Sequence, residues 1–312
     1  MYFPRPSRLI AGFVLAGLIG VAVYFLPVLQ SASTATVRTG PLPIQVPNPL
    51  PTTTAAFTVL LLGSDDDAKF AQDRVNTQSM ILIRVDPKAK AATMLSIPRD
   101  LWVPIPGQGM GKISTAYQTG GAYGAIAAVE SNFQVHIDDY VWIGLEGLVR
   151  LVDELGGVDM LITNPVMDDF YPADINTNDV YGNSRVAVLP GAAHLDGVHA
   201  LQYVRSRHGD LRGDFARSER QQQLLMAIKA RAERLGAADM PGLAAAMQGE
   251  LKTTIGLARL RLLFSISGDF DASSVHRVIL LPPDTSEGTA AGQDVVFPDW
   301  SQILPLVHQT FP

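Results

Sequence analysis

The N-terminal part of the chain is one continuous apolar run, whereas the rest alternates between short apolar segments and polar turns. Residues 9–29 contain no charged side chain, and about 20 helical residues suffice to cross a bilayer core. Arg5 and Arg8 precede the run, and the next charge is Arg38. Because positive charge stays on the cytoplasmic side, this pattern predicts a single-pass membrane protein with residues 1–8 in the cytoplasm and its main domain outside.

A cleaved signal peptide is the alternative interpretation, since Ser33 and Ala35 could define a cleavage site. The apolar core of a signal peptide is only about 7–15 residues long, which favours an uncleaved anchor here. Residues 30–56 are rich in Ser, Thr, Pro and Ala and predict an extended linker without a core of its own. Both interpretations place the following domain outside the cytoplasm.

Residues 57–312 are expected to form one layered α-β-α domain with a mixed central sheet, because short apolar runs alternate with helical patterns. Polar residues dominate 164–190, which predicts an exposed loop. The expected helices span 121–133, 146–155, 196–206 and 214–235, with more helix after 240. The expected strands span 57–63, 79–85, 92–97, 140–143, 158–162 and 275–281.

The composition narrows the possible functions. A formal net charge of −6 argues against nucleic acid as a partner, so any binding of phosphate needs a local cluster of cations. The absence of cysteine excludes disulfides, Cys-based zinc sites and thiol nucleophiles. Residues 107–112 fail as a nucleotide-binding loop, because the glycine spacing is one residue short and Ile113 replaces the required Ser or Thr.

Arginine is concentrated between positions 205 and 220. The planar guanidinium binds phosphate oxygens in pairs and keeps its charge, so the cluster predicts an anion site near the start of a helix that Asp214 would cap. A helix with surface ion pairs to Asp210 and Glu219 is an equally open interpretation. The cluster consists of Arg205, Arg207, Arg212, Arg217 and Arg220.

Acidic residues and one further arginine follow predicted strands. Asp65, Asp66 and Asp67 come directly after the first strand, where they could hold Mg²⁺ beside phosphate oxygens or form a solvated turn. Arg99 follows the third strand and could meet Asp65 and the helix arginines at one edge of the sheet, although an arginine in this place is often structural.

Several segments, taken in order, resemble the LytR-CpsA-Psr family of bacterial cell-wall enzymes. The resemblance extends from about residue 57 to 235 and continues more weakly to the C-terminus. The matching segments are Leu60-Leu-Leu-Gly-Ser-Asp65, Met94-Leu-Ser-Ile-Pro-Arg-Asp100, Lys112-Ile-Ser-Thr-Ala-Tyr117, Leu151-Val-Asp-Glu-Leu-Gly-Gly-Val-Asp159, His194-Leu-Asp-Gly197, Ala200-Leu-Gln-Tyr-Val-Arg-Ser-Arg207 and Asp214-Phe-Ala-Arg-Ser-Glu-Arg-Gln-Gln222.

The resemblance implies a phosphotransferase that moves a glycopolymer from a polyprenyl diphosphate carrier onto peptidoglycan and releases polyprenyl phosphate. Asp65 would hold Mg²⁺ or Mn²⁺, and helix 121–133 would enclose the lipid tail with the sheet. Lys112, Gln221 and Asp214 would support the phosphate site. The residues that would clamp the diphosphate are Arg99, Arg205, Arg207, Arg217 and Arg220.

Two positions depart from the pattern of the family. Asn76 stands where an arginine is expected, and Gln78 stands where a second metal-binding aspartate is expected. A neutral ligand at 78 would weaken binding of Mg²⁺. Two alternatives therefore stay open: a non-catalytic binder of polyprenyl phosphate or assembly scaffold, and a diphosphatase that uses water in place of the acceptor sugar.

Overall fold

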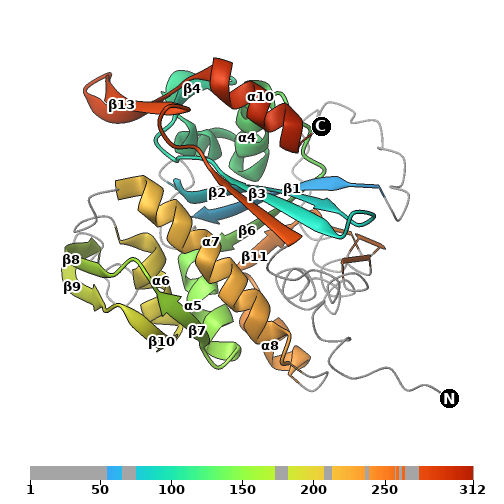
Figure 1. Ribbon diagram of the computed structural model, residues 1–312, viewed down its shortest axis with the longest axis vertical. Helices are drawn as coiled ribbons and strands as arrows, with labels where there is room; N and C mark the ends of the chain where they lie inside the picture. The colour runs from blue at the N-terminus through green and yellow to red at the C-terminus, as the bar shows by residue number, and fades with distance from the viewer. Residues whose placement is uncertain are drawn as a thin grey trace.

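A mixed sheet lies at the centre of the protein (Figure 1). The computed structural model describes residues 55–64, 75–172, 182–206, 213–235, 239–256, 258–259, 262–263 and 274–311. Within these residues the sheet has six strands in the order β11-β6-β1-β2-β3-β12. Their bounds are β1 Phe57–Ser64, β2 Thr77–Asp86, β3 Ala91–Ser96, β6 Asp139–Gly144, β11 Leu251–Thr253 and β12 Val275–Ile279.

Both faces of the sheet are covered, which explains the continuous apolar sequence of its first strand. Successive side chains of a strand point to opposite faces. Accordingly, Leu60 and Leu62 are buried in one core, while Val59 and Leu61 lie in another. Strand β1 pairs with β2 antiparallel and with β6 parallel. The predicted α-β-α domain with a mixed sheet is therefore confirmed.

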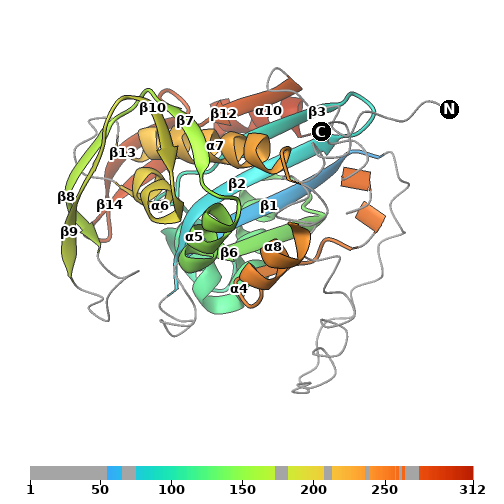
Figure 2. The same cartoon turned by 90° about the horizontal axis from the view of Figure 1, so that it is seen from below.

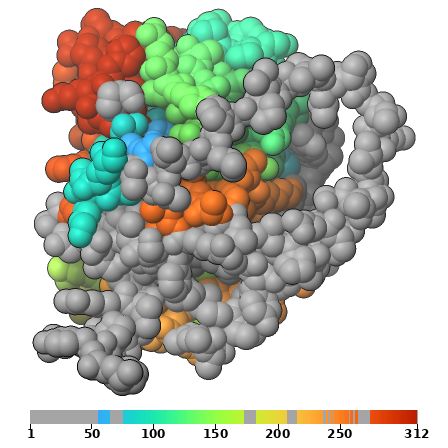
Figure 3. Space-filling model, turned by 90° about the vertical axis from the view of Figure 1, so that its right-hand side faces the viewer, coloured from blue at the N-terminus to red at the C-terminus, as the bar shows by residue number. Residues whose placement is uncertain are grey.

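Helices form a layer on each face of the sheet (Figure 2). One layer contains α4 (Ala116–Phe133) and α10 (Trp300–Thr310), joined by edge-to-face contact of Phe133 with Trp300 at 5.3 Å between ring centres. Figure 3 shows the red C-terminal segment packed beside green residues from the middle of the chain. The other layer contains α5 (Leu145–Glu154), α6 (Gly197–Arg205), α7 (Gly213–Ala232) and α8 (Met240–Ala246).

Four two-stranded sheets surround this centre in the described part of the chain. They pair β4 (Trp102–Ile105) with β5 (Gly109–Lys112), β7 (Val158–Ile162) with β10 (Gly191–Leu195), β8 (Val166–Pro172) with β9 (Asn183–Val188), and β13 (Thr285–Ala290) with β14 (Gln293–Pro298). A short 3₁₀ turn, η3 (Ile113–Thr115), connects β5 to α4.

The predicted exposed loop at 164–190 is wrong in its described parts, because β8 and β9 occupy most of the residues that the structure describes there. Their inward positions include Val166, Val186 and Val188, which are all buried. Asp168 is buried among them at 1% exposure, and its backbone continues the strand. Because this inward position is polar, the sequence lacks the alternation of apolar and polar residues that would indicate a strand.

The predicted helix 121–133 is too short, since α4 begins at Ala116. Gly121 interrupts it with φ 59° and ψ −142°, a backbone conformation that glycine adopts without steric cost. The glycine pair 120–121 reads in sequence as a helix start, whereas in the structure it is a kink within one longer element.

The predicted anchor at 9–29 and most of the linker lie outside the described residues. Among the residues that are described, no helix is both long and apolar enough to span a bilayer. The assignment of residues 1–56 to a cytoplasmic end, an anchor and a linker stays a prediction.

Close packing of α6 on α5 gives a first testable prediction. A Cβ added at Gly197 would lie 2.1 Å from the carbonyl oxygen of Val149, which is backbone and cannot swing away. We expect Gly197→Ala to lower the free energy of unfolding by about 1–3 kcal/mol, the usual cost of overpacking. Urea unfolding measures this loss.

Gly120→Ala is the matched control, because a Cβ there meets nothing within 4 Å. Equal stability of the two variants would contradict the close approach of α5 and α6.

Candidate functional site

The ends of several strands meet at one edge of the sheet. Ser64 at the end of β1 pairs with Thr77 at the start of β2, and Ser96 at the end of β3 pairs with Ile279 at the end of β12. Parallel β6 ends beside β1 at Gly144. Carboxyl ends of strands are the usual place for ligands in open α/β sheets. We call this edge the strand-end edge.

A narrow apolar cleft extends inward from the strand-end edge, between the sheet and helices α5, α6 and α7. Its volume is about 80 Å³. Its apolar lining includes Leu61, Ile81, Leu145, Leu201, Leu224 and Ile228. Helix α4 does not contribute to the lining, because it packs on the opposite face with Leu60 and Leu62. Helix 121–133, which was expected to enclose a lipid tail, is thus not among the elements that line this cleft, whereas α5, α6 and α7 are.

Polar side chains gather where the apolar cleft reaches the strand-end edge. Gln78 and Ser79 come from the start of β2, while Arg205, Arg217 and Gln221 come from α6 and α7. The Ser79 hydroxyl donates to Oε1 of Gln221 at 2.9 Å. This contact joins the sheet to α7 across the cleft. The cleft is thus apolar along its length and cationic at one end.

The two arginines in the first half of α7 are buried. Arg217 is 4% exposed and Arg220 is fully buried. Nη2 of Arg220 donates to the carbonyl oxygen of Ser206 at 2.7 Å, and its guanidinium lies 5.7 Å from the ring centre of Tyr203. The interpretation of these two residues as members of surface ion pairs is therefore wrong. Burial of a guanidinium is costly, and in α/β proteins it commonly serves anion binding.

Arg205, at the end of α6, lies in the same region. Its guanidinium is 5.7 Å from the ring centre of Tyr171 on β8. The β8–β9 hairpin that was predicted as a loop thus helps to position a residue of the predicted clamp. Arg207 and Arg212 lie outside the described residues.

Arg99 joins the cluster through side-chain contacts of its own. Its Nη1 donates to Oε1 of Gln78, and its Nε lies 3.5 Å from Oδ2 of Asp100. Nζ of Lys112 lies 2.8 Å from Oδ1 of the same aspartate. Asp100 is buried, and its carboxylate pairs with both cations. Arg99 thus contacts Gln78 at the polar end of the cleft, and Lys112 is linked to Arg99 through Asp100.

The two residues that depart from the family pattern accept hydrogen bonds through their side-chain oxygens. Oδ1 of Asn76 accepts from Nε2 of Gln118 at 3.1 Å, and the carbonyl oxygen of Gln78 accepts from Arg99. The side-chain oxygen of Gln78 carries no charge and already accepts from Arg99. Gln78 is therefore a poorer ligand for Mg²⁺ than the aspartate that the family pattern places there. Asp65, Asp66 and Asp67 lie outside the described residues, and the residues within the described ranges form no acidic or histidine cluster of metal-binding type.

Sequence reasoning missed Ser79 and Gln222. Gln222 donates from Nε2 to the hydroxyl of Ser96 at 2.8 Å and to the carbonyl of Val278 at 3.1 Å, so it ties α7 to β3 and β12. Three consecutive glutamines, 221–223, were the available signal, since polar residues on the inner face of a sheet-packed helix need partners.

Comparison with known proteins decides the family. The model of the LytR_cpsA_psr family matches residues 29–297, which include every segment of the site described above. The chain belongs to the LytR-CpsA-Psr family. The resemblance inferred from the sequence motifs is thereby confirmed.

Two named relatives match a little more than half of the chain. Polyisoprenyl-teichoic acid–peptidoglycan teichoic acid transferase TagV of Bacillus subtilis is 37% identical over 176 residues, which cover 55% of this chain and 42% of TagV. The corresponding TagU of Enterococcus faecalis is 37% identical over 175 residues, which cover 55% of this chain and 52% of TagU. The matched region is thus about half the length of these relatives.

Solved structures of the LytR-CpsA-Psr family share the fold over most of the chain. The crystal structure of B. subtilis TagV superposes with a TM-score of 0.67 at 27% identity, covering 83% of this chain and 96% of the chain in that structure. The structure of TagT bound to LIIa-WTA superposes with the same TM-score at 26% identity, covering 85% of this chain and 93% of the chain in that structure. The overall fold is therefore shared with these structures.

Proposed function

We propose that this protein transfers a glycopolymer from a polyprenyl diphosphate carrier to peptidoglycan and releases polyprenyl phosphate. The observation that carries the proposal is an apolar cleft that ends at buried arginines. A lipid diphosphate has this same polarity, with an apolar tail and a dianionic head. The names of TagV and TagU, which both describe transfer of a polymer from a polyisoprenyl carrier to peptidoglycan, support the same reaction.

In this reaction an acceptor sugar hydroxyl forms a bond to the phosphorus nearest the donor glycan. The bond between that phosphorus and the oxygen that bridges the two phosphates breaks, and its electron pair leaves with polyprenyl phosphate. The hydroxyl proton is released to solvent or to the departing phosphate. Charge spreads over the phosphate oxygens in the transition state, so positioned cations contribute most of the catalysis.

The arrangement of the cations suggests a division of roles. Arg217 and Arg205 line the cleft at its polar end and would hold the phosphate attached to the lipid. Arg99 and Lys112, which both pair with Asp100, would stabilise the phosphate at which the bond forms. Arg220 is fully buried and would position the start of α7 through Ser206.

The cleft has a volume of about 80 Å³, which is smaller than a polyprenyl tail. The cleft would therefore widen when the lipid binds. The tethered anchor at 9–29 would keep the domain at the outer surface of the membrane, within reach of the carrier.

We also propose that Asp65 holds a Mg²⁺ or Mn²⁺ ion, which would neutralise phosphate charge. Asp65 directly follows β1, which ends at the strand-end edge. Gln78, whose side-chain oxygen accepts from Arg99, would add no charge to this site, because a neutral amide stands where the family pattern has an acidic ligand.

Product analysis tests the proposal against its alternatives. Full-length protein in detergent is incubated with a lipid diphosphate-linked glycan, with and without peptidoglycan. Release of polyprenyl phosphate together with polymer-modified peptidoglycan is the expected result. Release without peptidoglycan would show a diphosphatase, and co-purified polyprenyl phosphate without release would show a non-catalytic binder.

Restoring the family pattern should strengthen metal binding. In the double variant Asn76→Arg, Gln78→Asp, a carboxylate replaces the carbonyl oxygen that faces Arg99, and a second charged ligand becomes available. We expect the dissociation constant for Mn²⁺, measured by electron paramagnetic resonance, to fall about tenfold, because affinity follows the charge of the ligands.

Asn76→Arg alone is the control for this double variant, since it adds no ligand. An unchanged affinity for Mn²⁺ in the double variant would argue that position 78 does not face the metal.

A further inference from the structure

Helix α7 separates two cavities. Arg217, Gln221, Leu224 and Ile228 line the apolar cleft. Phe215, Glu219 and Gln222 line a second cavity, an open groove of about 1020 Å³. Each set follows helical spacing, and the two sets are offset by two residues, which is a rotation of about 200°. The cavities therefore lie on opposite faces of one helix.

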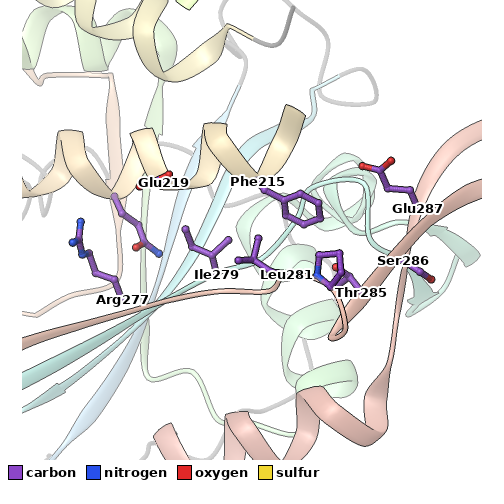
Figure 4. Close-up of a pocket in the computed structure, with 10 residues that line it drawn as sticks. Phe215, Glu219, Arg277, Ile279, Leu281, Thr285, Ser286 and Glu287 are labelled. Atoms are coloured by element: carbon purple, nitrogen blue, oxygen red, sulfur yellow. The ribbon is translucent and has the colours of Figure 1, made fainter. Parts of the chain in front are cut away.

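The open groove is bounded by α7 on one side and by the C-terminal β13–β14 hairpin on the other (Figure 4). Ile279 and Leu281 form part of its apolar floor, and the ring of Phe215 lies between α7 and the hairpin. Phe215 and Glu287 also line a neighbouring hollow of about 590 Å³, which the hairpin and β5 enclose. The two hollows thus share a wall and form one extended surface, here called the hairpin groove.

Side-chain contacts connect the hairpin groove to the polar end of the apolar cleft. The smaller hollow of the groove is lined by Lys112 and by Asp100, whose carboxylate pairs with Lys112 and Arg99. Arg99 in turn donates to Gln78 of the cleft. The amide nitrogen of Val296 on β14 donates to the carbonyl oxygen of Asp100 at 2.9 Å. This hydrogen bond fixes the hairpin beside the residue that holds Arg99 and Lys112. A ligand in the groove can therefore extend to the phosphates without crossing the lipid cleft.

The lining of the hairpin groove suits a sugar chain. The half-buried ring of Phe215 offers an aromatic face, whose negative potential attracts the polarised C–H groups of a pyranose. Glu219, Glu287 and Asp294 present carboxylate oxygens that accept from sugar hydroxyls, and Arg277 presents a donor. With three carboxylates and few cations away from Lys112, the groove favours a neutral or cationic polymer over a polyphosphate.

Reaction geometry decides which of the two sugar chains would lie there. In phosphoryl transfer the attacking and leaving oxygens lie roughly in line across the phosphorus. The leaving group is the lipid phosphate, whose tail we place in the cleft on one face of α7. The attacking hydroxyl must therefore arrive from the opposite side, which is where the hairpin groove ends.

We infer that the hairpin groove binds the acceptor glycan strand, with Phe215 as its stacking platform and Glu287 as a hydroxyl acceptor. This inference rests on the proposed transfer function and assigns the second substrate of the same site. It also gives the C-terminal hairpin a function, since β13–β14 supplies one wall of the groove.

Binding measurements test the groove independently of catalysis. Full-length protein in detergent is titrated into a fluorescently labelled, lipid-free peptidoglycan oligosaccharide, and fluorescence anisotropy gives the dissociation constant. We expect Phe215→Ala and Glu287→Lys each to weaken binding at least tenfold. Glu287 is exposed on a strand, so its variant keeps the result interpretable if Phe215→Ala folds poorly. Phe170→Ala, at an exposed aromatic on β8, is the matched control and should bind as the wild type does.

The outcomes separate the inference from the proposed function. Unchanged peptidoglycan affinity in both groove variants, or no binding by the wild type, would overturn the inference. A soluble teichoic acid oligomer that loses affinity in the groove variants while peptidoglycan does not would also overturn it and assign the groove to the donor. Mass spectrometry of co-purified polyprenyl phosphate reports on the lipid cleft separately. Its absence would count against the proposed function, whereas the anisotropy result would still decide the groove.

Discussion

Arg217→Ala is expected to lower kcat/KM for glycan transfer by about 10³-fold. Arg217 is 4% exposed and lines the apolar cleft at its cationic end, where a guanidinium meets phosphate oxygens in a poorly solvated site. Charge-stabilising arginines in phosphoryl transfer contribute 10³-fold or more. This factor corresponds to about 4 kcal/mol of transition-state stabilisation. Release of polyprenyl phosphate under limiting lipid substrate measures the effect.

Arg217→Lys should recover only part of the lost rate, because an ammonium keeps the charge but loses the paired donors of the guanidinium. Arg185→Ala is the control, since Arg185 is an exposed arginine on β9 that pairs with Asp169. Thermal unfolding of each variant shows whether the fold is intact. A folded Arg217→Ala variant with more than a tenth of the wild-type rate would remove Arg217 from the diphosphate clamp.

Leu225→Trp is expected to weaken binding of polyprenyl phosphate by about 100-fold. Leu225 lines the apolar cleft from α7, and an indole there would occupy space that the lipid tail needs. A factor of 100 corresponds to about 2.7 kcal/mol, which equals the burial of three or four methylene groups. The amount of lipid that co-purifies with the full-length protein, counted by mass spectrometry, measures the change.

Ala230→Trp on the exposed side of the same helix is the control for added bulk. If the Leu225→Trp variant keeps its fold and retains wild-type amounts of lipid, the tail lies elsewhere and the cleft serves only packing. Loss of lipid together with retained binding of peptidoglycan would support two separate cavities on the two faces of α7.

Short apolar runs, separated by polar turns, determined the central strands from the sequence alone. Residues 57–63, 79–85 and 92–97 were predicted as strands, and the structure has β1, β2 and β3 there. Each is buried on at least one face, so its apolar content is a local requirement that is visible in the sequence. The motifs determined the family in the same way, because strand ends carry their functional residues at fixed positions along the chain.

The location of the apolar cleft could not be predicted from the sequence. Helix 121–133 is apolar and was expected to cover a lipid, but α4 packs on the face of Leu60 and Leu62, away from the cleft. An apolar helix can cover either face of a sheet that is buried on both sides. The path of the connecting chain decides the face, and that path is a property of the whole fold.

The arginine cluster also shows which properties the sequence determined and which only the fold decided. Its residue types and spacing indicated an anion site, but the sequence left surface ion pairs as an equal alternative. Burial excluded that alternative for Arg217 and Arg220, and contacts across more than 20 residues placed Arg99 against Gln78. The sequence thus shows directly which side chains are present and how they are spaced. Solvent exposure and partners depend on segments that meet only after folding, and these decided the lipid cleft, the clamp and the hairpin groove.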